Sequence, residues 1–131
     1  MLYVLVFLLV CQGASGAAGI TTSRGMQQRA AAWACKVDTQ FACAADKCQD
    51  RQASLTVTID FRKRTYTRCV LSVCETYKFT YEQWGEYSVI HFDRKGGAYA
   101  IAVNDGREFT ESVSQGMWTL SGFGSCIPRR K

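Results

Sequence analysis

Apolar and polar residues alternate with a period of two along residues 55–61. Leu55, Val57, Ile59 and Phe61 take the odd positions, and polar residues stand between them. A period of two is typical of a β-strand that has one face on a core and the other in water. Similar short runs recur along the rest of the chain, which therefore predicts a series of short strands.

Turn residues separate these runs. The segments 94–97 (Arg-Lys-Gly-Gly) and 104–106 (Asn-Asp-Gly) indicate tight hairpin turns, because glycine readily adopts the positive φ that such turns need. With a first strand at 33–37, the pattern predicts about eight strands, and no segment between them is long enough for a parallel crossover. We therefore expect an all-β fold, a small antiparallel up-and-down β-barrel stapled by disulfides, with a β-sandwich as the alternative.

We expect apolar side chains to fill the barrel, without a large ligand chamber, because about eight strands enclose just enough room for side chains. Alanines at 98, 100 and 102 leave a little space inside. The expected interior residues are Val57, Ile59, Phe61, Phe79, Ile90, Phe92, Ile101, Phe109 and Trp118.

The chain begins with an unbroken apolar run of ten residues, and small residues follow at 13–17. The run is shorter than the roughly 20 apolar residues that span a bilayer. This pattern predicts a secretory signal peptide over residues 1–17, although its start carries no Lys or Arg. Two alternatives stay open: a cytosolic chain that starts at Met26, and a lipoprotein anchored through Cys11.

The remaining 114 residues are enough for one domain. Residues 18–31 show no apolar period and are expected to be a flexible lead-in. The barrel domain is expected over 32–127, followed by a basic tail over 128–131. Residues 38–54 are expected to form a stapled loop with one short helical turn near 44–48.

Seven cysteines become six when the signal peptide is removed, and an even number in a small exported chain predicts a disulfide framework. Two pairs have four residues between their members, which suits a bridge across a tight turn. The last pair would tie the chain ends together. A four-cysteine zinc site is the alternative. The expected disulfides are Cys43–Cys48, Cys69–Cys74 and Cys35–Cys126.

Few residues suggest catalysis. The single histidine, His91, is read as a surface or rim residue beside Asp93. Glu108 and Glu111 could act as an acid–base pair, but we read them as residues of an exposed strand face. No phosphate loop, zinc-protease helix or nucleophile elbow is present. We therefore predict a protein without enzymatic activity, catalytic residues, metal or cofactor.

Basic residues outnumber acidic ones by sixteen to eleven, which gives a net charge of +5. The excess gathers at 62–64 with nearby Arg68, at 94–95 and at 129–131. Such groups attract phosphates, anionic lipid headgroups or acidic proteins, and the alternative is that they only keep hairpin tips soluble. Export argues against a nucleic acid partner.

The turn Lys95-Gly96-Gly97, followed by small and aliphatic residues up to Ile101, is similar to a turn in the C-type lysozyme inhibitors. Together with the length, the signal and the end-tying cysteine pair, it makes residues 33–126 resemble small exported bacterial β-barrels of that kind. The family's Ser-Gly-x-x-Tyr element is missing here, and four of the cysteines depart from the family. The resemblance implies a periplasmic or lipid-anchored barrel that presents loops to the lysozyme cleft.

We expect an exported binding protein of the cell envelope, periplasmic or secreted, that binds a protein or an anionic envelope component. An inhibitor of a wall-degrading enzyme is one version, and a small carrier of an apolar ligand inside the barrel is the alternative. Membrane contact is expected only if Cys11 is lipidated. The candidate contact residues are Arg62, Arg64, Arg94, Lys95 and Tyr99.

Overall fold

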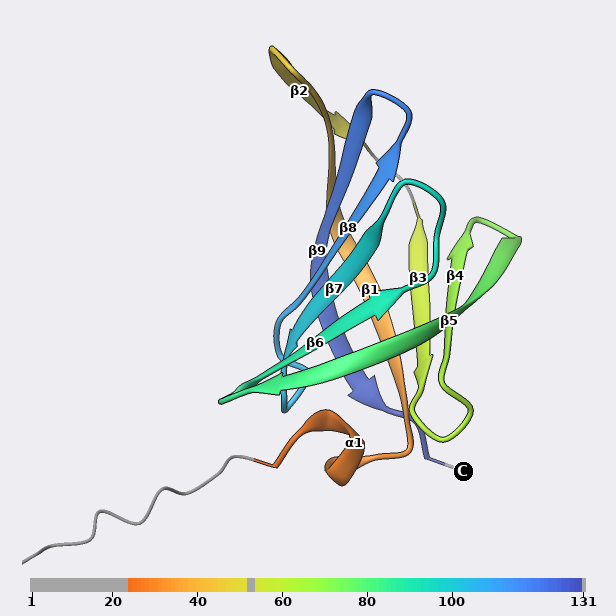
Figure 1. The fold of residues 1–131 in the computed structure, drawn as a ribbon, viewed down its shortest axis with the longest axis vertical. Coiled ribbons are helices and arrows are strands. Elements are labelled where there is room, and N and C mark those ends of the chain that lie inside the picture. Colours follow the sequence, from red (N-terminus) through yellow and green to blue (C-terminus); the bar gives the residue numbers. More distant parts are fainter. Residues whose placement is uncertain (1–23, 52–53, 131) are drawn as a thin grey trace, which may run out of the picture.

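The structure is a computed structural model that describes residues 24–51 and 54–130. The expected signal peptide and Cys11 lie outside the described residues. One short helix and nine strands are formed by the described part of the chain (Figure 1). Their bounds are α1 Met26–Arg29, β1 Ala32–Ala44, β2 Lys47–Arg51, β3 Leu55–Asp60, β4 Thr65–Val70, β5 Val73–Trp84, β6 Tyr87–Phe92, β7 Ala98–Val103, β8 Phe109–Gln115 and β9 Trp118–Pro128.

The predicted antiparallel barrel is confirmed. Each strand from β3 to β8 pairs with the next, β3 also pairs with β1, and the pairing of β1 with β9 closes a ring of eight strands. Successive turns alternate between the two ends of this ring. The turns at 71–72, 94–97 and 116–117 lie at the end that we call the mouth, and the turns at 61–64 and 104–106 lie at the opposite end (Figure 1).

The helix α1 covers the end opposite the mouth, which we call the closed end (Figure 1). Met26 is fully buried there, and the Trp33 ring nitrogen donates a hydrogen bond to its carbonyl oxygen at 3.1 Å. The amide of Met26 donates to the Ser88 hydroxyl at 3.4 Å. The expected flexible lead-in over 18–31 is therefore wrong for residues 24–31, because a buried apolar side chain fixes them to the barrel.

Over residues 38–51, a stapled hairpin replaces the loop and helical turn expected for 38–54. The strand β1 continues to Ala44, and β2 pairs with its outer half as a ninth strand outside the ring. The pairing of β1 with β9 shifts register between Val37 and Thr39. This irregularity breaks the period-two pattern, which explains why the sequence suggested a strand that ends at Val37.

The core largely contains the expected residues. Seven of the nine expected interior side chains are buried, whereas Trp118 is only partly buried. Ile101 points outward, because Ala100 and Ala102 take the inward positions of β7. The small side chain of Ala102 pairs across the strands with Phe109, whose ring fills the interior at this level.

The three expected disulfides are confirmed: Cys35–Cys126, Cys43–Cys48 and Cys69–Cys74. Each bridge joins two residues that face each other across a pair of strands. The alternative zinc site is excluded, because its four cysteines are oxidised. Three disulfides in a chain of this size indicate an oxidising environment outside the cytoplasm. Within the ranges 24–51 and 54–130, no helix is long and apolar enough to cross a membrane.

Removal of the Cys35–Cys126 bridge is expected to cost more stability than removal of Cys43–Cys48. The first closes a sequence separation of 91 residues and the second a separation of 5. Chain entropy then predicts losses of about 4–5 and about 2 kcal/mol for the respective double Cys→Ala variants. Urea unfolding of both variants measures the difference, and equal losses would show that loop length does not govern these bridges.

Candidate functional site

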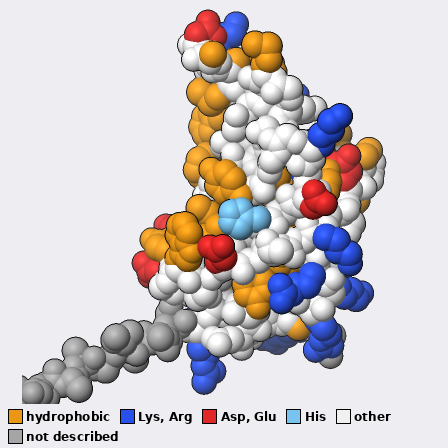
Figure 2. All heavy atoms as spheres, viewed as in Figure 1, with side chains coloured by type: hydrophobic (Ala, Val, Ile, Leu, Met, Phe, Trp, Pro, Cys, Tyr) orange, Lys and Arg blue, Asp and Glu red, His pale blue; other side chains and the backbone are white. Residues whose placement is uncertain are grey.

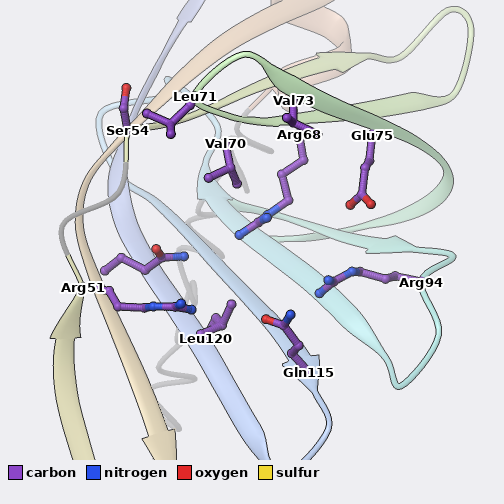
Figure 3. A pocket seen from close by; sticks show the side chains of 11 residues that line it. Arg51, Ser54, Arg68, Val70, Leu71, Val73, Glu75, Arg94, Gln115 and Leu120 are labelled. Carbon is purple, nitrogen blue, oxygen red and sulfur yellow. The ribbon is translucent and has the colours of Figure 1, made fainter.

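A cavity of about 490 Å³ opens at the mouth of the barrel. Its walls combine polar side chains with apolar ones from several strands and turns, and the side chains converge on one space (Figure 3). The expected filled interior is therefore confined to the part of the barrel below this cavity. The lining residues are Gln40, Arg51, Ser54, Arg68, Val70, Leu71, Val73, Glu75, Arg94, Gln115 and Leu120.

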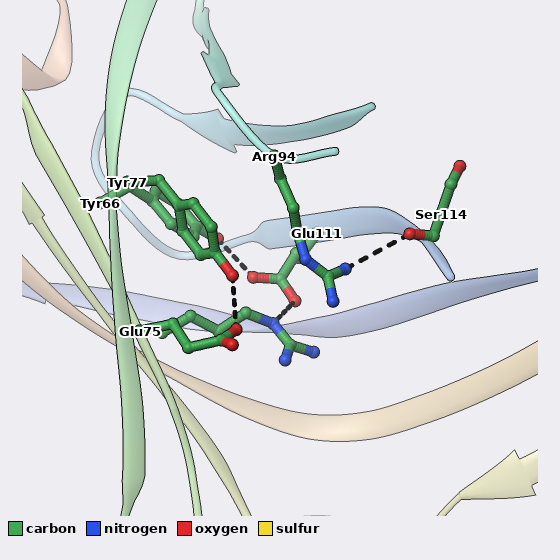
Figure 4. Close-up of polar contacts among 7 residues, drawn as sticks. Tyr66, Glu75, Tyr77, Arg94, Glu111 and Ser114 are labelled. Atoms are coloured by element: carbon green, nitrogen blue, oxygen red, sulfur yellow. Dashed lines mark hydrogen bonds and ion pairs between the residues drawn. The ribbon is translucent and has the colours of Figure 1, made fainter. Parts of the chain in front are cut away.

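An ion pair lies beneath the cavity, inside the barrel. Arg68 Nε donates to Glu111 Oε1 at 2.7 Å, and the Tyr66 hydroxyl donates to Glu111 Oε2 at 2.7 Å (Figure 4). Arg68 is 6% exposed and Glu111 is 1% exposed. Hydrogen bonds from two residues of β4 thus satisfy both carboxylate oxygens of a glutamate on β8, as a buried charge requires.

The Tyr66 hydroxyl stays protonated and donates a hydrogen bond to Glu111. Burial raises the pKa of Tyr66 well above its ordinary value of 10.0, and the neighbouring negative charge of Glu111 raises it further. The Phe92 ring stacks on Tyr66, with 4.1 Å between the ring centroids. The phenol therefore stays protonated and keeps its hydrogen bond to Glu111 at any physiological pH.

A second tyrosine, Tyr77, lies opposite Tyr66 on the neighbouring strand β5. The Tyr77 hydroxyl donates to the carboxylate of Glu75, which lines the cavity (Figure 4). Partial burial raises the pKa of Tyr77, the hydrogen bond to Glu75 raises it further, and Arg94 acts in the opposite direction. Glu75 is thus already engaged by a neighbour on its own strand.

Two buried side chains at the cavity have unused hydrogen-bonding capacity. Arg68 uses Nε for Glu111, but its two terminal nitrogens bond to no other described residue. Gln40 is 4% exposed, and its amide likewise has no hydrogen bond within the described ranges. The terminal nitrogens of Arg68 and the side-chain amide of Gln40 are not fully enclosed by protein atoms, so a molecule in the cavity can reach them. Buried polar groups nearly always form hydrogen bonds, so these groups are candidates for contact with a ligand.

Positive charge dominates the cavity. The guanidinium groups of Arg51, Arg68 and Arg94 point into it (Figure 3), and Glu75 is the one carboxylate among its lining residues. Arg94 reaches the backbone carbonyl of Ser114 at 3.5 Å. Neither Arg51 nor Arg94 forms an ion pair with a described carboxylate. Arg51, Arg68 and Arg94 carry three positive charges, and Glu75 and the underlying Glu111 carry two negative ones. One positive charge therefore remains unbalanced.

The structure divides the five predicted contact residues among three places. Arg94 lines the cavity, and Lys95 follows it on the same exposed turn. Arg62 and Arg64 lie at the closed end, where the Arg64 guanidinium sits over an aromatic ring. Tyr99 lies opposite His91 on neighbouring strands, on the outer surface. The single histidine is exposed among hydrophobic side chains (Figure 2), as expected for a surface residue.

Two residues of the site were misread from the sequence. Glu111 is buried, although it was expected on an exposed face, and Arg68 belongs to the interior, although it was grouped with the basic turn. The signal was present, because Glu111 shares its strand face with Phe109 and Val113. Arg68 likewise follows the buried Tyr66 by two positions. The missing information was that the two charges meet across the barrel.

Within the described parts of the chain, no group of three or more His, Cys, Asp or Glu side chains is arranged to hold a metal ion. Comparisons with models of protein families, with curated proteins and with solved structures find no match to this chain. The cavity therefore has to be interpreted from its own chemistry.

Replacement of Tyr66 by phenylalanine is expected to change how stability depends on alkaline pH. Because folding raises the pKa of Tyr66, the folded state keeps a proton that the unfolded state loses above about pH 10. The native protein should lose about 1.4 kcal/mol per pH unit above that point through this group, and below that point the group should not make stability depend on pH. Urea unfolding at a series of pH values should show a shallower alkaline decline for Tyr66→Phe.

The matched control is Tyr99→Phe, which removes a hydroxyl from the outer surface. Tyr66→Phe should also lower stability at neutral pH by about 1–3 kcal/mol, because Glu111 loses a buried donor. An identical alkaline decline in the native protein and in Tyr66→Phe would contradict the assignment.

Proposed function

We propose that the protein is a non-enzymatic binding protein, periplasmic or secreted, that takes a small anionic ligand into the mouth of its barrel. The ligand would carry a carboxylate, sulfonate or phosphate group. This group would contact the terminal nitrogens of Arg68 on the cavity floor, with Arg51 and Arg94 on the walls. The disulfides support a place outside the cytoplasm.

The unused donors of Arg68 carry this proposal. Arg68 is almost completely buried, yet its terminal nitrogens face an open cavity and bond to no described protein group. Glu111, which Tyr66 fixes in turn, holds the guanidinium in place from below, so little side-chain entropy is lost when an anion binds. A planar guanidinium fixed in this way matches the two oxygens of a carboxylate or phosphate.

The same lining speaks against a purely apolar ligand. Val70, Leu71, Val73 and Leu120 supply apolar surface, but three guanidinium groups share the space. An apolar molecule would displace water from these charges without replacing its hydrogen bonds, and that loss is costly. A ligand with an anionic group and an apolar portion fits both parts of the lining.

Binding of inorganic phosphate and of acetate can be followed by NMR through the arginine Nε–Hε signals. We expect the signals of Arg51, Arg68 and Arg94 to shift with either anion. The double variant Arg51→Gln/Arg94→Gln should weaken binding by at least about tenfold, because each charge-assisted hydrogen bond contributes more than a neutral one. Arg68 itself is left intact, because its removal would leave Glu111 unpaired.

The control is Arg62→Gln/Arg64→Gln, which removes the same number of charges at the closed end. Its mouth signals should respond to phosphate as those of the native protein do. Equal responses of the arginines at both ends, or no response at the mouth, would contradict the proposal.

Inhibition of a wall-degrading enzyme is a second candidate. It is favoured by the position of Arg94 and Lys95 on a turn beside the mouth, where Met117 on a neighbouring turn is 87% exposed. If this candidate holds, the protein inhibits lysis of cell walls by a C-type lysozyme. Arg94→Glu/Lys95→Glu should then lose the inhibition, whereas Arg62→Glu/Arg64→Glu should retain it. A native protein without inhibitory effect would remove this candidate.

A further inference from the structure

Five exposed basic residues lie together at the closed end, although they come from two distant parts of the sequence. Three form the turn between β3 and β4, and two follow the end of β9. We call them the basic cluster: Arg62, Lys63, Arg64, Arg129 and Arg130.

Backbone hydrogen bonds bring the two groups together. The amide of Phe61 donates to the carbonyl of Ala31 at 2.8 Å, and the amide of Arg129 donates to the carbonyl of Ala32 at 2.9 Å. The two groups therefore leave the barrel beside consecutive residues of the chain. Their proximity follows from barrel closure and does not depend on flexible side chains.

The charges of the basic cluster are not neutralised locally. Asp60 is the nearest carboxylate in the sequence, and it accepts a hydrogen bond from the backbone amide of Lys63 at 2.9 Å. None of the five cluster side chains forms an ion pair with a described carboxylate. Figure 2 shows Lys and Arg side chains gathered at the lower right of the view, where few acidic side chains appear.

The mouth differs in this respect. Its exposed turns carry Lys47 and Lys95, but acidic residues stand beside them, including Asp46 and Asp93. Basic and acidic side chains there alternate over short distances, so their potentials largely cancel beyond a Debye length of about 8–10 Å. An extended anionic surface is therefore attracted more strongly to the basic cluster than to these exposed turns of the mouth.

One further feature of the closed end points to a membrane. Ile127 is 67% exposed and precedes the C-terminal part of the basic cluster by two residues, so an apolar side chain stands beside the charges.

We infer that the closed end docks on the surface of an anionic lipid bilayer and that the mouth faces away from it. Clusters of roughly four to eight Lys and Arg residues are typical of binding to anionic headgroups, and guanidinium groups pair well with their phosphates. Ile127 would enter the interfacial region beside them. The inference is independent of the ligand proposed for the cavity.

A membrane fits better than a nucleic acid or an acidic protein. Single-stranded nucleic acids need exposed aromatic rings for base stacking, but Arg64 already covers Tyr81, with 4.7 Å between the guanidinium and the ring centroid. A stable protein interface needs a contiguous apolar centre, whereas Ile127 stands next to charged residues. A fluid headgroup layer needs neither feature.

Co-sedimentation with vesicles tests the inference. We expect the protein to bind vesicles that contain equal parts of phosphatidylglycerol and phosphatidylcholine, and not to bind vesicles of pure phosphatidylcholine. Added salt should release the bound protein. Each removed charge should lower the partition coefficient by about fivefold, so Arg129→Gln/Arg130→Gln should bind roughly twenty-five-fold more weakly. Ile127→Ser should weaken binding by about tenfold or more.

The matched control, Arg94→Gln/Lys95→Gln, removes the same charge at the mouth and shares the same N-terminal segment. It should bind vesicles as the native protein does. An equal loss in this control, or no loss in Arg129→Gln/Arg130→Gln, would overturn the inference. Tighter binding to heparin or polyglutamate than to anionic vesicles at the same salt concentration would also overturn it, because the partner would then be an acidic polymer.

Discussion

The closure of the barrel between β1 and β9 is the constraint on which the rest of the structure depends. The pairing runs from Trp33 opposite Pro128 to Cys43 opposite Thr119, and the Cys35–Cys126 bridge lies within it. Closure removes the interior from water, which strengthens the bond between Arg68 and Glu111 and makes either charge costly to leave alone. The same pairing places the two halves of the basic cluster side by side.

The two ends of the barrel differ in the elements and side chains that cover them. At the closed end, α1 inserts Met26 and the turn at 61–64 carries only basic side chains at its exposed positions. At the mouth, the turns stay apart around a cavity whose floor is a fixed guanidinium. A ligand would enter and leave such a barrel through the same opening, the mouth. A membrane bound at the closed end would leave the mouth free.

Local pattern predicted much of the fold, because strand faces and glycine turns depend on neighbours in the sequence. The pairing of cysteines followed for the same reason, since hairpin geometry places Cys69 opposite Cys74. The site could not be predicted in this way. Arg68 and Glu111 are 43 residues apart, and each looks like a solvated charge until the barrel closes. An inward-facing charge flanked by apolar positions two residues away is the one local sign of such a pair.

The strand β2 forms an edge of the sheet. Every strand of the ring has hydrogen-bonding neighbours on both sides, whereas β2 pairs with β1 alone within the described residues. An unpaired strand margin invites other chains to add to it and so to aggregate. Here all five residues of β2 are exposed, and three of them, Lys47, Asp50 and Arg51, are charged. Charged side chains along a short, protruding strand discourage such pairing, so they protect this edge against sheet growth.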